Sequence, residues 1–260
     1  MQENERTVVI RDTKQLLRPA TRRGFLRALG LGGTVVLLPS VFAACEDSFG
    51  SEAAPEVTEA FRRANTITLN LNNDIGIFNF AFLLEQLEAA FYEQAVASTA
   101  FQQLSTPEQE LITDLRNDEV THRQFLATAL GSAAIRPAAF NFDGRFASRD
   151  TILNTALALE QTGVAAYNGA GNNLSNVNNL LVAGKIVSVE ARHAAALADA
   201  LDTTGVAYAD LTRLTAFGAD DATARDNVLE APAVLPLAAP FINTTITPVE
   251  LGALPTEPTA

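Results

Sequence analysis

The sequence predicts an all-α protein: a four-helix bundle with one long crossover connection, followed by a proline-rich C-terminal arm. Three observations lead to this prediction. The 260-residue chain is 48% hydrophobic, rich in alanine and free of tryptophan, which suits a close-packed helical bundle better than a β-sandwich. Four segments carry apolar residues at helical spacing. The connections between them are short, long and short, the order expected for a bundle with one crossover.

The first helix pair has clear start and stop signals. Asn73 is a capping residue for a helix over about 74–98, whose apolar residues recur every three or four positions. The second helix is expected over 105–130, with Pro107 in its first turn and Gly131 directly after it. A short loop joins the two, which favours an antiparallel hairpin.

The second helix pair follows a longer connection. Residues 131–147 contain Pro137 and Gly144 and form the predicted crossover. The third helix is expected over about 148–171 and the fourth over about 175–201, again with a short loop between them.

The two pairs resemble each other in sequence. Two motifs recur at equivalent places: Leu-Glu-Gln followed by a tyrosine (Glu85 with Tyr92; Glu160 with Tyr167) and Glu-x-x-His (Glu119 with His122; Glu190 with His193). A duplicated helical hairpin predicts a bundle with a pseudo-two-fold axis, in which equivalent side chains meet at the centre.

The repeated motifs indicate a metal site. In Glu-x-x-His the carboxylate and the imidazole lie three residues apart on a helix and project to the same side, so they can bind one cation together. Four carboxylates and two neutral imidazoles balance two divalent ions, a pattern known from helical bundles. The predicted ligands are Glu85, Glu119, His122, Glu160, Glu190 and His193. We expect Glu85 and Glu160 to bridge the two metals.

The alternative to a metal site is a pair of solvated helix faces with incidental histidines. The chain has only two histidines, and both follow a glutamate by three positions. Apolar residues such as Leu84, Leu159 and Val189 surround the candidate ligands. A buried carboxylate without a partner is costly, so the metal site is the better interpretation.

Three further residues are candidates for contacting the ligands rather than the metal itself. Glu88 lies one turn from Glu85 and could compete with it, but the repeat places Gly163 at the equivalent position, so we assign Glu88 to the surroundings of the site or to the surface. Tyr92 and Tyr167 lie two turns past the glutamates of their helices. Each either donates a hydrogen bond to a ligand carboxylate or is a core aromatic residue.

The first 45 residues have the features of an export signal. Arg22-Arg23 followed by Phe25-Leu26 resembles the twin-arginine motif, and a short, glycine-rich apolar run follows it. Phe42-Ala43-Ala44-Cys45 resembles a lipoprotein lipobox with Cys45 as the lipidated residue, although phenylalanine stands where leucine is usual. The alternative is cleavage after Ala43 or Ala44, which leaves a free thiol. We expect an exported protein, on the periplasmic or cell-surface side of the envelope.

The chain therefore divides into four predicted parts: the signal (1–45), an acidic tether (46–68), the bundle (69–204) and a C-terminal extension (205–260). The extension contains proline among apolar residues, which is too apolar for a disordered tail. We expect an extended arm packed on the bundle, or else a protein contact surface.

The bundle residues resemble the ferritin-like superfamily, and more narrowly bacterial ferritin-like domain proteins related to desiccation-associated proteins. The stretch Ile77–Ala81 with Leu84–Tyr92 is similar to the first helix of that group, and the resemblance covers about residues 70–205. The resemblance implies the bundle and the metal site more strongly than it implies a reaction.

Charge and motifs limit the classes of function that the sequence supports. Residues 45–260 hold 11 basic and 27 acidic residues, a net charge of −16, which disfavours binding of nucleic acid or anionic lipid. We expect two Fe or Mn ions as cofactors, small oxidants as partners, and membrane contact only through a lipid anchor. One hypothesis is an oxidoreductase acting on Fe(II), O₂ or peroxide at the cell envelope. The other is a non-catalytic stress protein with a structural or vestigial metal site. The oligomeric state does not follow from the sequence.

Overall fold

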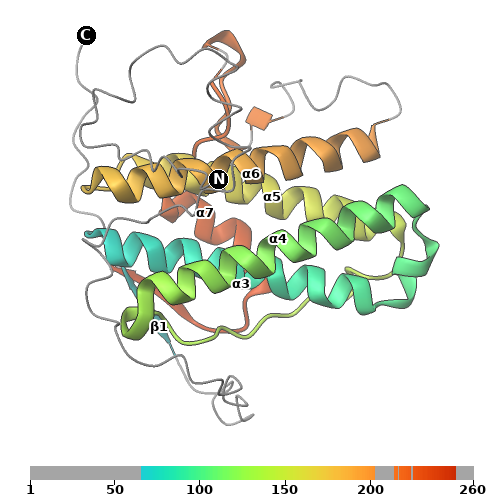
Figure 1. The fold of residues 1–260 in the computed structure, drawn as a ribbon, viewed down its shortest axis with the longest axis horizontal. Coiled ribbons are helices and arrows are strands. Elements are labelled where there is room, and N and C mark those ends of the chain that lie inside the picture. Colours follow the sequence, from blue (N-terminus) through green and yellow to red (C-terminus); the bar gives the residue numbers. More distant parts are fainter. Residues whose placement is uncertain (1–65, 203–213, 216, 224, 250–260) are drawn as a thin grey trace, which may run out of the picture. The chain divides into compact units, whose positions relative to one another are not determined.

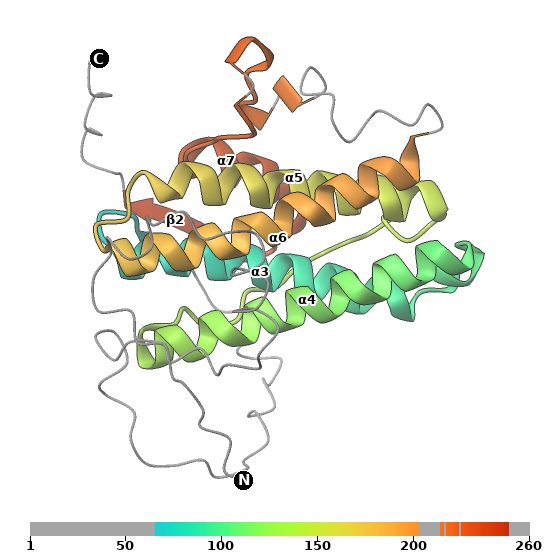
Figure 2. The ribbon, with the colours of Figure 1, turned by 45° about the horizontal axis from the view of Figure 1, so that its top comes forward.

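Four long helices dominate the computed structural model, which describes residues 66–202, 214–215, 217–223 and 225–249. The helices are α3 (Asp74–Ala97), α4 (Thr106–Leu130), α5 (Arg149–Gly171) and α6 (Val177–Leu201), and their arrangement as a bundle is shown in Figures 1 and 2. The prediction of an all-α four-helix bundle is confirmed. Two short strands, β1 (Ile67–Asn70) and β2 (Ile246–Val249), and a short helix, α7 (Ala231–Ala238), accompany the bundle.

Local capping interactions explain where the long helices begin and end. The Asn73 side chain accepts a hydrogen bond from Gly76 N at 2.9 Å, which caps α3. The Glu108 side chain accepts one from Ser105 N at 2.8 Å, and Pro107 occupies the first turn of α4. Helix α4 stops at Gly131, whose φ of 52° favours glycine.

The bundle is made of two hairpins joined by the long crossover. Helix α3 packs against α4, and α5 packs against α6, while α3–α5 and α4–α6 contacts join the two hairpins. The crossover runs along the length of the bundle from the end of α4 to the start of α5 (Figure 1). Side chains of α3 hold it in place: Asn79 bonds with Ala133 O and Ile135 N, at 2.9 and 2.7 Å.

Strand β1 corrects the predicted extent of the tether. It pairs in parallel with β2, with Ile67 opposite Ile246 and Asn70 opposite Val249. Residues 67 and 68 therefore belong to the folded part, because β2 from the far end of the chain supplies their partners. The rest of the predicted tether, apart from residue 66, lies outside the described residues, as do the signal and Cys45.

The C-terminal part is more helical than predicted. An extended arm was expected, but residues 231–238 form α7, which packs on α5. Pro232 lies in the first turn of α7, where a missing N–H costs nothing, so proline here is compatible with a helix start. The preceding segment lies close to α5: Leu229 N donates to Ala165 O at 3.0 Å.

Apolar layers enclose the centre of the bundle on both sides. One cluster includes Ile112 and Leu115, which precede Glu119 on α4, and a second includes Leu126, which follows His122. The polar residues of the repeated motifs thus lie between two hydrophobic layers. Within the described residues, no helix combines the length and the hydrophobicity that a membrane span requires.

Candidate metal centre

The six predicted ligands converge at the middle of the bundle, although they come from four different helices. All four carboxylates (Glu85, Glu119, Glu160 and Glu190) have a relative exposure of 0%. The His193 residue is 6% exposed, and the His122 side chain is 13% exposed. The donor atoms form two groups, in each of which all atoms lie within 4.8 Å of one another.

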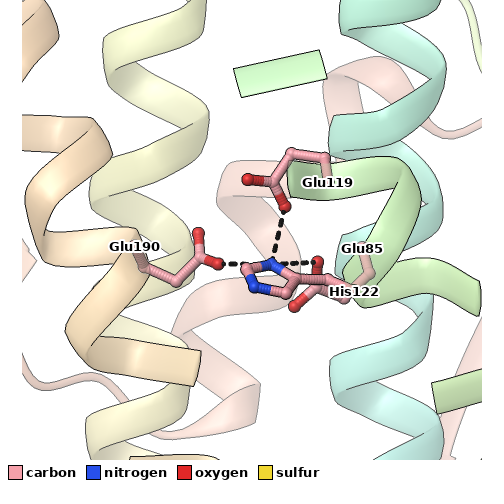
Figure 3. Close-up of side chains that lie close together, drawn as sticks. All are labelled: Glu85, Glu119, His122 and Glu190. Carbon is pink, nitrogen blue, oxygen red and sulfur yellow. Dashed lines mark hydrogen bonds and ion pairs between the residues drawn. The ribbon is translucent and has the colours of Figure 1, made fainter. Parts of the chain in front are cut away.

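The first group surrounds His122 (Figure 3). The Nδ1 atom of His122 lies 3.1 Å from Glu119 Oε2, 3.0 Å from Glu190 Oε1 and 3.4 Å from Glu85 Oε2. These three carboxylates come from α4, α6 and α3, so a single imidazole nitrogen is the meeting point of three helices.

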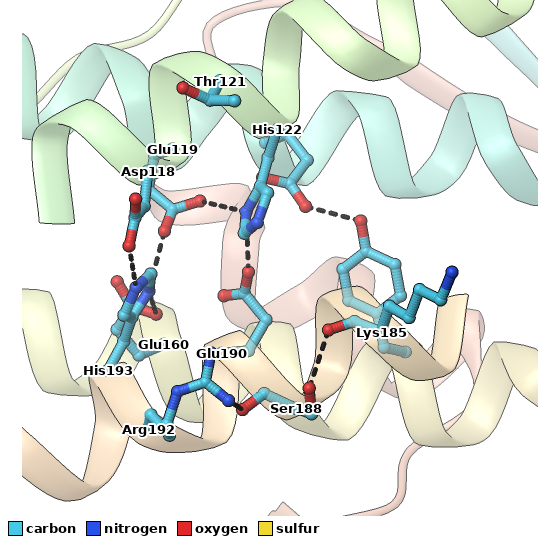
Figure 4. Close-up of polar contacts among 12 residues, drawn as sticks. Asp118, Glu119, Thr121, His122, Glu160, Lys185, Ser188, Glu190, Arg192 and His193 are labelled. Carbon is cyan, nitrogen blue, oxygen red and sulfur yellow. Dashed lines mark hydrogen bonds and ion pairs between the residues drawn. The ribbon is translucent and has the colours of Figure 1, made fainter. Parts of the chain in front are cut away.

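The second group surrounds His193 (Figure 4). The Nδ1 atom of His193 lies 2.8 Å from Glu119 Oε1 and 3.3 Å from Glu160 Oε2, and Glu190 completes the group. The two imidazole rings lie 6.4 Å apart between centroids. The arrangement repeats that of the first group, as the sequence repeat predicts.

The residues shared by the two donor groups differ from the pair predicted to bridge. Glu119 and Glu190 belong to both groups, whereas Glu85 and Glu160 belong to one group each. The reason is the direct contact of α4 with α6: Glu119 turns one oxygen to His122 on its own helix and the other to His193 on α6. The glutamates of the Glu-x-x-His motifs are therefore placed to bridge.

Both tyrosines contact a candidate ligand, which decides between the two alternatives left open by the sequence. Tyr92 Oη donates to Glu160 Oε1 at 2.6 Å, and Tyr167 Oη donates to Glu85 Oε1 at 2.5 Å. Each hydroxyl crosses to the other helix of the α3–α5 pair. These hydrogen bonds hold one oxygen of each non-bridging carboxylate in place.

Asp118 is a site residue that the sequence reasoning missed. Its Oδ2 lies 3.1 Å from His193 Nε2, the ring nitrogen that faces away from the carboxylates (Figure 4). A carboxylate in this position fixes the orientation of a metal-binding imidazole. The repeat gave no signal for it, because Val189 stands at the equivalent position before Glu190.

The buried carboxylate oxygens at the centre have few partners. Among the described residues, Glu85 Oε2 and Glu190 Oε1 share the single nitrogen His122 Nδ1, Glu119 Oε1 faces only His193 Nδ1, and Glu190 Oε2 has no hydrogen-bond partner. Buried acceptors are normally satisfied, and leaving a carboxylate unpaired is costly. Oxygen and imidazole donors in this number fit Fe or Mn ions, so the residues present can hold them.

Burial and mutual repulsion alter the proton affinities of the cluster. Burial raises the pKa of Glu119 to about 7, with Glu160 adding to the effect and the two histidines opposing it. Burial, Glu119 and Glu85 raise the pKa of Glu190 well above its usual range. Burial alone would lower the pKa of His193, but hydrogen bonds with Glu119 and Glu160 raise it to about 11. The cluster thus retains protons that a bound cation would displace.

Comparison with protein families identifies the fold. The sequence model of the ferritin-like domain matches residues 73–203, half of the chain, which span all four long helices. The chain belongs to the ferritin-like domain family. No curated protein matches it. In this ferritin-like protein, the matched segment contains all six converging residues, as well as Asp118 and both tyrosines.

Glu88 lies beside the centre of the ferritin-like domain and not on its surface. Its relative exposure is 2%. Burial raises its pKa well above the usual range, and Glu190, Glu160, Glu119 and Glu85 add to the shift in that order. The surface alternative for Glu88 is therefore excluded.

Proposed function

We propose that the chain is an exported dimetal-carboxylate protein that carries out redox chemistry on Fe(II), O₂ or peroxide at the cell envelope. The observation that carries the proposal is the pair of overlapping donor groups sharing Glu119 and Glu190. Two cations held by shared carboxylates lie close enough to act on one small oxidant. When bound, Fe or Mn ions would supply the exchange of electrons with that oxidant.

The residues of the chain would hold the ions and limit the access of water. Four carboxylates and two Nδ1 atoms provide the donors, and the two tyrosine hydroxyls keep Glu85 and Glu160 oriented. A solvent-exposed hollow of about 360 Å³ is lined by Tyr167, Gly171, Gly184 and Val187 among others. Tyr167 lines this hollow and also contacts Glu85 through its hydroxyl, so a single side chain separates the hollow from the centre on this side.

Oxygen consumption tests this function. The full chain, loaded with Fe(II) or with Mn(II), should take up O₂ or remove peroxide and should develop the absorption of a bridged metal pair. Glu119→Gln should abolish the activity, because it removes the charge of a shared ligand. Glu110→Gln, an exposed change on the same helix, is the control. An absence of oxygen uptake, peroxide loss and bridged-pair absorption from the loaded chain would contradict the proposal.

Export is supported by the sequence features of the first 45 residues. The paired Arg22-Arg23 suits the twin-arginine route, which moves folded proteins, and Cys45 suits attachment of lipid. Replacing both arginines by lysine should leave the protein in the cytoplasm, and Cys45→Ser should release it from the membrane fraction. Cell fractionation measures both, and an unchanged distribution contradicts the corresponding step.

A non-catalytic stress protein is the second candidate, and the deep burial of the centre favours it. All four carboxylates are fully buried, so bound metal could serve stability alone. Metal stoichiometry separates the candidates. Fewer than one ion per chain after careful loading, with unchanged thermal stability, favours a vestigial site. Two ions with a raised melting temperature but no reactivity toward oxidants favours a structural site.

A further inference from the structure

The internal repeat is broken at one buried position near its pseudo-two-fold axis. Helices α3 and α5 run antiparallel (Figure 1). The tyrosine contacts place residue 92 at about the same height along the bundle as residue 160, and residue 167 at about the same height as residue 85. Glu88 and Gly163 lie about midway between these levels on their helices, so they face each other close to the axis.

Only one side chain fits at this place. A Cβ atom added at Gly163 would lie 2.9 Å from Glu88 Oε1 and 3.2 Å from Glu190 Oε2. The carboxylates of Glu88 and Glu190 therefore border the same small volume, which the absence of a side chain at residue 163 leaves open. A second glutamate at position 163 could not be accommodated beside them.

Glu88 is buried directly beside another carboxylate of the centre. It is 2% exposed, and its Oε1 borders the same space at Gly163 as Glu190 Oε2, an oxygen that has no hydrogen-bond partner among the described residues. A buried carboxylate in this situation is strongly unfavourable unless a cation compensates it. Its neighbour Glu190 is one of the two glutamates shared by both donor groups, so a cation held by Glu190 would lie nearby.

We propose that Glu88 is a fifth carboxylate ligand of the metal centre, and that Gly163 makes room for it. This inference rests on the proposed binding of metal. The centre would then be asymmetric, with an additional oxygen donor on the α3–α5 side, opposite the histidine-bearing α4–α6 pair. The extra negative charge would strengthen binding of cations in general.

Glu88→Gln tests the proposal, because it keeps the size of the side chain and removes its charge. The full chain is freed of metal and titrated with Mn(II) in competition with a chelator, and its melting temperature is recorded. We expect the metal-free variant to melt at a higher temperature than the wild type, since one of two adjoining buried acids is removed. We expect Mn(II) affinity to fall roughly tenfold or more. Glu110→Gln should change neither quantity.

A second comparison does not depend on the stability of the first variant. Gly163→Ala should weaken Mn(II) binding in the wild type, because the added methyl group displaces the Glu88 carboxylate. In a Glu88→Ala background, the same change should have little further effect. Two Mn(II) ions bound with unchanged affinity by both Glu88→Gln and Gly163→Ala would overturn the role of Glu88 and leave the metal centre intact. No Mn(II) binding by the wild type would overturn both.

Discussion

At the scale of single residues, the two imidazoles of the centre differ although their motifs are the same. Asp118 contacts Nε2 of His193, which directs Nδ1 toward the carboxylates. Val189 takes the place of Asp118 in the other half of the repeat and offers His122 no such contact. A hydrogen-bonded imidazole is a stronger and better-oriented ligand, so the two metal positions should differ in affinity.

Asp118→Asn should weaken binding at the His193 position and leave the other position nearly unchanged. The expected loss is about 10- to 100-fold at one of two binding steps, as for other residues that orient a metal-binding histidine. Calorimetric titration with Mn(II) resolves the steps, and Asp114→Asn on the exposed side of the same helix is the control. If both steps weaken equally, or if neither step weakens, the assignment of Asp118 to the His193 position is contradicted.

The tyrosine hydroxyls should contribute equally, since the repeat makes them equivalent. Tyr92→Phe and Tyr167→Phe each remove a buried hydrogen bond to a carboxylate, at 2.6 and 2.5 Å. A loss of about 1.5–3 kcal/mol in the free energy of unfolding is expected for each. Urea denaturation of the metal-free chain measures it. A change below about 0.5 kcal/mol would mean that the hydroxyls only fill space.

At the scale of elements, the sequence predicts those features that are set by residues close together in the chain. The bounds of the four long helices follow closely from capping residues such as Asn73 and from Gly131. The pair shared by both donor groups differs from the predicted pair because the repeat shows which residues are equivalent but not which helices touch. Strand β1 was missed because its partner lies at the other end of the chain. Helix α7 was missed because its prolines resemble those of an extended arm.

Two glycines test how the C-terminal segment is held on the bundle. A Cβ atom at Gly169 would lie 2.1 Å from Leu229 O, so Gly169→Ala must push the segment that leads into α7 away from α5. The expected cost is about 1–3 kcal/mol. A Cβ atom at Gly184, within α6, meets nothing within 4 Å, so Gly184→Ala should stabilise the protein by about 0.5–1 kcal/mol. Thermal unfolding should show these opposite signs; equal effects would contradict the close packing at Gly169.

At the scale of the whole molecule, folding concentrates negative charge that cations or protons must balance. The pKa of Glu119 rises from 4.5 to about 7, and that of His193 from 6.5 to about 11. Both groups bind protons more tightly in the folded state than in the unfolded state. Each contributes stability at low pH that is lost as the pH rises through the folded-state pKa.

The metal-free chain should therefore lose stability between pH 5 and pH 9. The increase in melting temperature on metal binding should become larger as the pH rises, because bound ions then have fewer protons to displace. Melting temperatures across this range, with and without Mn(II), measure both. Glu119→Gln should flatten the metal-free profile. A metal-free melting temperature that rises toward pH 9 would contradict the assigned proton affinities.

Metal content per chain tests the central claim most directly. The full chain is loaded with Fe(II) or Mn(II), freed of loosely bound ions and subjected to elemental analysis alongside Glu119→Gln. Two shared-ligand groups in one bundle predict two ions per chain in the wild type and a loss of bound metal in the variant. Fewer than one ion per chain in the wild type, or the same content in both proteins, would contradict a dimetal centre.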